Sequence, residues 1–126
     1  MIENKNILIE KNNDSFFLVV EPVKINIGNF NGSIDLNKIK SKIKSFIEKK
    51  FDLKKYNIDI ENVSLQVNIR KRKNKIYYVF LARKKNNSIK IGYYHINIDD
   101  PNDMEKKKEV EAVAFIIRLY NHLKYF

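Results

Sequence analysis

The chain contains no cysteine, and its 126 residues include only three glycines, two prolines and four arginines. Without cysteine it can form neither a disulfide bond nor a thiolate metal site. So few glycines and prolines argue against disorder or low complexity. No apolar run approaches the roughly 20 residues that span a bilayer, and the first six residues lack the pattern of a secretion signal. We therefore expect a cytoplasmic protein with no membrane partner.

Motifs of catalysis are also missing. There is neither a Gly-x-Ser-x-Gly elbow nor a phosphate-binding glycine loop. His95 and His122 are the only histidines, so a zinc site is not expected. Asp99, Asp100 and Asp103 could hold Mg²⁺ for phosphodiester chemistry, but acidic residues before a helix are more often caps. The sequence therefore predicts a protein that is not an enzyme and uses neither a metal nor another cofactor.

The length and the 44% hydrophobic content predict one globular domain over residues 1–126. Apolar runs at 7–9 and 16–20 flank a polar turn at 11–14, which indicates an N-terminal β-hairpin. Alternation over 23–27 indicates a short third strand. Apolar residues at three- and four-residue spacing then predict a helix over 35–51, with Ser33 or Asp35 as its cap.

The second half of the chain predicts a three-stranded antiparallel arrangement and a final helix. Strict alternation marks a strand over 63–70, and 76–83 is apolar on both faces, as in a central strand. In 88–98 the apolar phase slips, which predicts a bulge at Gly92-Tyr93. The connector 52–62 is a candidate for a further strand at Ile58 and Ile60. The expected class is α+β, with an antiparallel or mixed sheet, in the order β-β-(β)-α-β-β-β-α, and the C-terminal helix packed on the sheet.

From Val110 to Phe126 the apolar arc covers about half of the last helix. A helix that is apolar over so wide an arc contacts either two layers of its own fold or another subunit. The alternative to a monomer is therefore a homodimer formed through this helix.

The positive charge is concentrated in the middle of the chain. The formal net charge is +10; residues 34–56 carry eight lysines against three acids, and residues 57–98 carry nine lysines and arginines against two acids. Both flanking segments are slightly acidic. Lysine, isoleucine and asparagine together make up 57 residues, a bias that raises lysine content by itself. The clustering is not explained by that bias, and a confined positive field attracts polyanions.

The basic residues fall into three groups. The tip between the first two strong strands can enter a nucleic-acid groove or clamp phosphates, although a solvated turn is the alternative. The second hairpin tip lies at the other end of the sheet, so Lys90 and lysines of the first helix would have to join the two. The predicted nucleic-acid-binding residues are Arg70, Lys71, Arg72, Lys73 and Lys75 at the first tip, Arg83, Lys84 and Lys85 at the second, and Lys90, Lys38, Lys42 and Lys49.

Aromatic residues on the predicted sheet give a further candidate. If Tyr78 and Phe80 face the core, then Tyr77, Val79 and Leu81 face outward, where Tyr93 and His95 could join them to stack unpaired bases. We favour the interpretation in which the N-terminal strands or a partner cover this face, because Val79 and Leu81 are poor base platforms. Tyr77 and Tyr93 remain the candidate aromatic contacts.

The order helix, three strands, helix, with lysines opening the last helix, resembles that of double-stranded-RNA-binding domains over residues 35–124. The glycine- and histidine-bearing loop of that family has no counterpart between Arg70 and Ile76. Residues 63–124 resemble the arm-binding domains of tyrosine recombinases to a similar degree. These resemblances imply nucleic-acid binding but do not identify a family.

The sequence therefore predicts a small, non-catalytic, nucleic-acid-binding accessory protein that contacts mainly backbone phosphate, with weak sequence selectivity. The alternative is a protein-interaction module that docks on an acidic or nucleic-acid-processing partner. A phage or mobile-element inhibitor of the anti-CRISPR type would be one such module. Its anchors would be Tyr77, Tyr93, the Tyr125-Phe126 end and the same cations.

Overall fold

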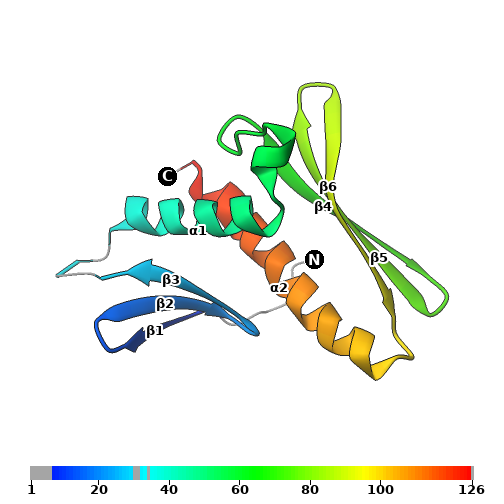
Figure 1. Ribbon diagram of the computed structural model, residues 1–126, viewed down its shortest axis with the longest axis horizontal. Coiled ribbons are helices and arrows are strands. Elements are labelled where there is room, and N and C mark those ends of the chain that lie inside the picture. The colour runs from blue at the N-terminus through cyan, green and yellow to red at the C-terminus, as the bar shows by residue number, and fades with distance from the viewer. Residues whose placement is uncertain (1–6, 30–31, 34, 126) are drawn as a thin grey trace.

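The computed structural model describes residues 7–29, 32–33 and 35–125, and Figure 1 shows two three-stranded antiparallel sheets with two helices. The first sheet consists of β1 (Leu8–Asn12), β2 (Ser15–Val20) and β3 (Val23–Gly28). Helix α1 (Leu36–Lys50) and the short 3-10 helix η1 (Leu53–Tyr56) follow. The second sheet consists of β4 (Ser64–Arg72), β5 (Lys75–Lys84) and β6 (Asn87–Asn97), and α2 (Pro101–Leu123) ends the fold. The α+β class and the order of elements are confirmed, but the strands form two sheets rather than one.

Aspartate side chains cap the N-termini of both helices. The Asp35 carboxylate accepts hydrogen bonds from the backbone N–H groups of Asn37 at 3.0 Å and Lys38 at 3.4 Å. Asp100 accepts from the backbone N–H of Asn102 at 2.9 Å, with proline at the first helical position. Both caps satisfy N–H groups that have no partner within the helix. The acidic residues before α2 therefore act partly as the caps that the sequence predicted.

The expected strand at Ile58 and Ile60 is wrong, because the connector turns too sharply for extended chain. Asp52 and Asn57 flank η1 with positive φ values of 50° and 55°, in the left-handed region. Ile60 is fully buried and Ile58 is half-buried, so the two residues anchor the connector to the core without joining a sheet.

The second sheet has β5 in its centre, as predicted, with β4 and β6 paired antiparallel on either side. Phe80 pairs with Gly92, whereas Leu81 pairs with Lys90, so Ile91 is the additional residue of a bulge. This bulge lies one residue before the predicted position. A Cβ atom at Gly92 would come within 2.9 Å of the Phe51 ring, so glycine here permits the close approach of the end of α1.

Helix α2 runs between the two sheets, as Figure 1 shows, and forms the centre of the core. It packs against β4 and β6 on one side and against α1 and β3 on the other. Near its end, Asn121 and Lys124 donate hydrogen bonds to the backbone carbonyl oxygens of Leu65 and Val63. The buried residues of α2 are Val110, Ala112, Val113, Ala114, Ile116, Ile117 and Tyr120.

The wide apolar arc of α2 is therefore used within its own chain. None of the large exposed hydrophobic side chains among the described residues belongs to this helix. The apolar arc is therefore no longer a reason to expect a homodimer, and a homodimer through α2 stays a prediction. Within the part of the chain that the structure describes, neither helix is long and apolar enough to cross a membrane.

Candidate functional site

The candidate site is the face of the second sheet that points away from α2. In β5, Ile76, Tyr78, Phe80 and Ala82 are buried, whereas the alternating residues Tyr77, Val79 and Leu81 are only half-buried. Side chains of successive strand residues point to opposite faces, and residues paired across strands share one face. The strand register therefore defines the "open face": Ser64, Gln66, Asn68, Arg70, Arg72, Lys75, Tyr77, Val79, Leu81, Arg83, Ser88, Lys90, Tyr93, His95 and Asn97.

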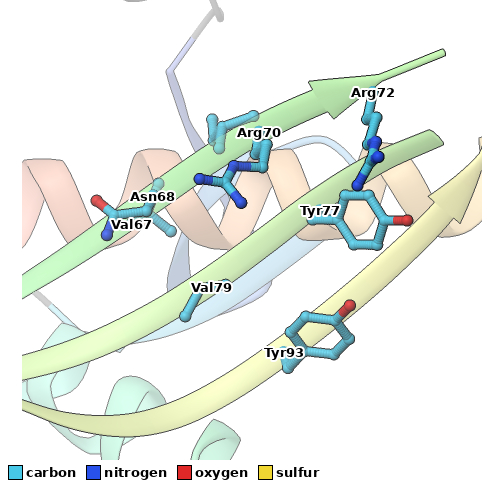
Figure 2. Close-up of a pocket in the computed structure, with 8 residues that line it drawn as sticks. Val67, Asn68, Arg70, Arg72, Tyr77, Val79 and Tyr93 are labelled. Carbon is cyan, nitrogen blue, oxygen red and sulfur yellow. The ribbon is translucent and has the colours of Figure 1, made fainter.

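No layer of the described chain covers this face. In Figure 1, α2, α1 and the first sheet all lie on the other side of β4, β5 and β6. Figure 2 shows Arg70, Arg72, Tyr77 and Tyr93 on the side nearer the viewer, with α2 behind the sheet. The expectation that the N-terminal strands cover this face is wrong. The first sheet packs through β3 on α1 and α2, which separate it from the second sheet.

The open face carries a cluster of rings. Tyr77 and His95 are stacked, with ring centroids 5.0 Å apart and 4° between the ring planes. The Tyr93 ring lies 6.3 Å from that of Tyr77, and the Lys90 ammonium is 5.4 Å from the Tyr93 centroid. Tyr93 is 51% exposed, so one large aromatic surface is open to solvent.

The open face has a shallow hollow beside these rings. The hollow has a volume of about 750 Å³ and is lined by Val67, Asn68, Ile69, Arg70, Arg72, Tyr77, Val79 and Tyr93. In Figure 2 the two guanidinium groups extend from β4 toward β5, where the Tyr77 ring lies. The hollow therefore combines aromatic and aliphatic surface with two groups that bind phosphate well.

The second sheet carries positive charge without compensation. Residues 64–97 contain nine lysines and arginines and neither aspartate nor glutamate. The ion pairs found between described residues use Lys24, Lys44, Lys50, Lys107 and Lys108, none of which belongs to this sheet. In the described ranges, none of the nine cations is paired with a carboxylate. A polyanion would therefore not have to displace an internal partner.

The two hairpin tips lie at opposite ends of the sheet, as expected. Lys73, with φ 57°, forms the first turn, and Lys85, with φ 55°, forms the second. β5 connects them over ten residues, so the tips are separated by about 30 Å. Lys71, Lys73, Lys84 and Lys85 therefore do not form one patch. The open face itself carries cations between the tips. Arg70 and Arg72 lie toward the first tip, and Lys90 and Arg83 lie toward the second.

Two carboxylates, those of Asp99 and Asp103, lie near the first hairpin tip. Asn74 donates a hydrogen bond to Asp99 at 2.8 Å, and Asp103 accepts one from the backbone N–H of Asn97 at 2.8 Å. These acids weaken the positive field at the first turn, whereas no hydrogen bond or ion pair joins a described carboxylate to the second tip. Across the described ranges, no group of three or more histidine, aspartate or glutamate side chains could hold a metal ion.

The structure does not bring the predicted lysines of α1 to this face. Lys38 is half-buried against β3 and donates a hydrogen bond to the Asn29 carbonyl oxygen at 2.7 Å. Lys42 and Lys49 are exposed, but α1 lies on the α2 side of the second sheet (Figure 1). The twelve predicted cations therefore separate into an open-face group, two tips and a helix group.

Asn68 was not named as a candidate from the sequence, whereas His95 was named as a possible stacking residue but not as a predicted contact. Asn68 lines the hollow, and His95 stacks on Tyr77. Both positions follow from strand alternation, since Asn68 has the same parity as Arg70 and His95 has the same parity as Tyr93. The alternation is visible in the sequence, but the uncharged amide of Asn68 does not by itself indicate phosphate or base binding.

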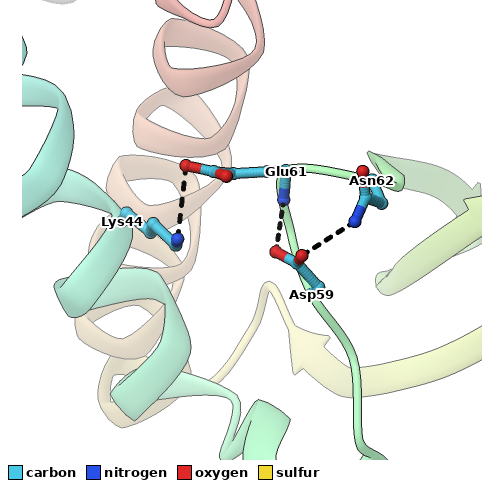
Figure 3. A network of polar contacts seen from close by, with 4 residues as sticks. All are labelled: Lys44, Asp59, Glu61 and Asn62. Atoms are coloured by element: carbon cyan, nitrogen blue, oxygen red, sulfur yellow. Dashed lines mark hydrogen bonds and ion pairs between the residues drawn. The ribbon is translucent and has the colours of Figure 1, made fainter.

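A second hollow, of about 480 Å³, is lined by residues of α1 and α2, and by Glu61 between them. Figure 3 shows Lys44 paired with Glu61 at 3.3 Å, and Asp59 accepting hydrogen bonds from the Glu61 backbone N–H and the Asn62 side chain. Burial, followed by the charges of Glu61, Glu48 and Asp59, raises the pKa of Tyr120 to about 12. Burial lowers the pKa of Lys124, against the opposing effect of Glu61 and Asp59. Because Glu61 lies in this hollow and pairs with Lys44, the hollow is less suited to a polyanion and is not the candidate site.

Comparison of the chain with family models, with curated proteins and with solved structures found no match.

Proposed function

We propose that this protein is a non-catalytic, nucleic-acid-binding accessory protein that contacts backbone phosphate through the open face of β4, β5 and β6. The observation that carries the proposal is a sheet with nine cations, no acidic residue and no ion pair to a described carboxylate. Such an uncompensated field concentrates polyanions at the surface and accelerates their association.

Phosphate contacts would come from several separated cations rather than from one pocket. Arg70 and Arg72 can each present a two-pronged guanidinium to phosphate oxygens, whereas Lys90 acts as a point charge. Only three of the nine cations in this sheet are arginines, and the open face has few amides that could read base edges. Binding with weak sequence selectivity follows, because phosphate contacts position a ligand without reading its sequence.

Salt dependence tests this proposal. We expect labelled single-stranded DNA, duplex DNA and RNA to include at least one ligand whose affinity falls steeply between about 50 mM and about 200 mM salt, because bound cations release counterions from phosphate. Three or more phosphate contacts predict a slope of log K against log salt of about −2 or steeper. Fluorescence anisotropy at four salt concentrations measures this slope.

Absence of binding to all three ligands at the lowest salt concentration would contradict the proposal. The open face would then fit the alternative function, docking on an acidic partner protein, through the same cations and the exposed Tyr93.

A further inference from the structure

We infer that the ligand of the open face is single-stranded nucleic acid, whose unpaired bases stack on the exposed ring of Tyr93 beside the Tyr77–His95 pair. This inference rests on the proposed function and adds the strandedness of the ligand. It is carried by aromatic surface that lies within the cationic field and that no described element covers.

Tyr93 is the ring on which we expect a base to stack, because it is exposed. Tyr93 is 51% exposed, although burying a side chain of this size would stabilise the fold. Tyr77 is half-buried because the stacked His95 ring and Tyr93 itself flank it. A base that stacks on Tyr93 would therefore also lie next to the Tyr77–His95 pair, and the base would gain apolar contact with more than one ring.

Exposed cations lie near the rings on β4 and β6, the strands on either side of Tyr77. The Lys90 ammonium is 5.4 Å from the Tyr93 centroid, and its side chain is exposed, so it can turn from the ring to a phosphate beside a stacked base. Arg70 pairs with Tyr77 across the strands, and Arg72 follows it along β4. Proteins that bind single strands generally stack bases on aromatic rings and hold the phosphates with neighbouring cations. The open face offers both kinds of group.

Ring spacing favours an unstacked strand over a duplex. The Tyr77 and Tyr93 centroids are 6.3 Å apart, nearly twice the roughly 3.4 Å between successive bases on a duplex strand. Two consecutive bases in duplex geometry could not lie on both rings. Within a duplex, moreover, neighbouring base pairs already cover each base face, so an exposed tyrosine gains no stacking there. Only a strand with free bases uses both the rings and the cations.

The test compares one sequence in two forms, as an oligonucleotide of about 12 nucleotides and as a duplex, with site sizes of about 4–16 nucleotides as the guide. DNA and RNA versions are both measured by fluorescence anisotropy. Tyr93→Ala is expected to weaken single-strand binding about 5- to 150-fold, the usual contribution of one base stack. Tyr93→Phe retains the ring and is expected to bind like the wild type. Duplex binding is expected to be unchanged by either substitution.

Tyr56→Ala is the matched control. Tyr56 on η1 is 36% exposed and has its own lysine, with the Lys55 ammonium 5.7 Å from the ring centroid, but it lies outside the second sheet. Its loss is expected to leave every affinity unchanged. Circular dichroism of each variant verifies that the fold is intact.

The inference is overturned if Tyr93→Ala binds single strands as tightly as the wild type, or if it weakens single-strand and duplex binding equally. In both cases the phosphate contacts of the proposed function would stand. Absence of all nucleic-acid binding at low salt would instead remove the proposed function and this inference with it.

Discussion

Charge reversal at three positions of the open face, Arg70→Glu, Arg72→Glu and Lys90→Glu in one chain, is expected to weaken nucleic-acid binding about 100-fold or more. A hydrogen bond to a charged group contributes about 1.5 kcal/mol or more, so the loss of two contacts already reaches that factor. The three new carboxylates would also repel phosphate next to the hollow. Anisotropy titrations at one fixed salt concentration measure the loss.

The control reverses three other exposed lysines, with Lys42→Glu, Lys49→Glu and Lys54→Glu in one chain. Both triple variants lower the formal net charge equally, but the control residues lie on α1 and η1 rather than on the open face. We expect the control variant to lose much less affinity. Equal losses would show that binding follows net charge alone and would contradict the assignment of the open face.

Phe80→Ala is expected to destabilise the protein by about 3–5 kcal/mol, the usual cost of removing a buried phenylalanine. Phe80 is completely buried in the central strand of the second sheet. Its ring centroid lies 5.0 Å from that of Phe51 at the end of α1 and 5.7 Å from that of Tyr94 on β6. The substitution would leave a cavity where α1 meets the sheet. Urea unfolding followed by circular dichroism measures the loss of free energy of unfolding.

Val79→Ala provides the comparison, because Val79 is the neighbouring residue in the same strand but lies on the open face. It is half-buried, so its truncation is expected to cost only about 1 kcal/mol. A cost at Val79 as large as that at Phe80 would mean that a further layer covers the open face, and would contradict the arrangement described above.

Local patterns in the sequence predicted the elements well. The alternation of Val63 to Ile69 gave β4, the spacing of Ile39, Ile43 and Ile47 gave α1, and the phase slip after Ile91 gave the bulge. These are properties of a residue and its close neighbours. The separation into two sheets was not predictable in this way, since periodicity shows which side chains share a face but not which strands pair.

The candidate site was predicted only in part, for the same reason. Alternation placed Tyr77 and Arg70 on the outer face, whereas the separation of Lys42 and Lys49 from that face depends on how α1 packs on α2. Val79 and Leu81 suggested a covered face. In the structure they are half-buried without a covering layer, because residues on the neighbouring strands shield a central strand from both sides.

The most direct test of the open face as the binding surface is an amide NMR titration of the full ¹⁵N-labelled chain with the oligonucleotide that binds it most tightly. We predict that the largest chemical-shift changes occur at Arg70, Tyr77, Tyr93 and His95, while Lys42 and Lys49 on α1 stay unchanged. Changes concentrated on α1 or on the first sheet, with none on β4, β5 and β6 at saturation, would contradict the account.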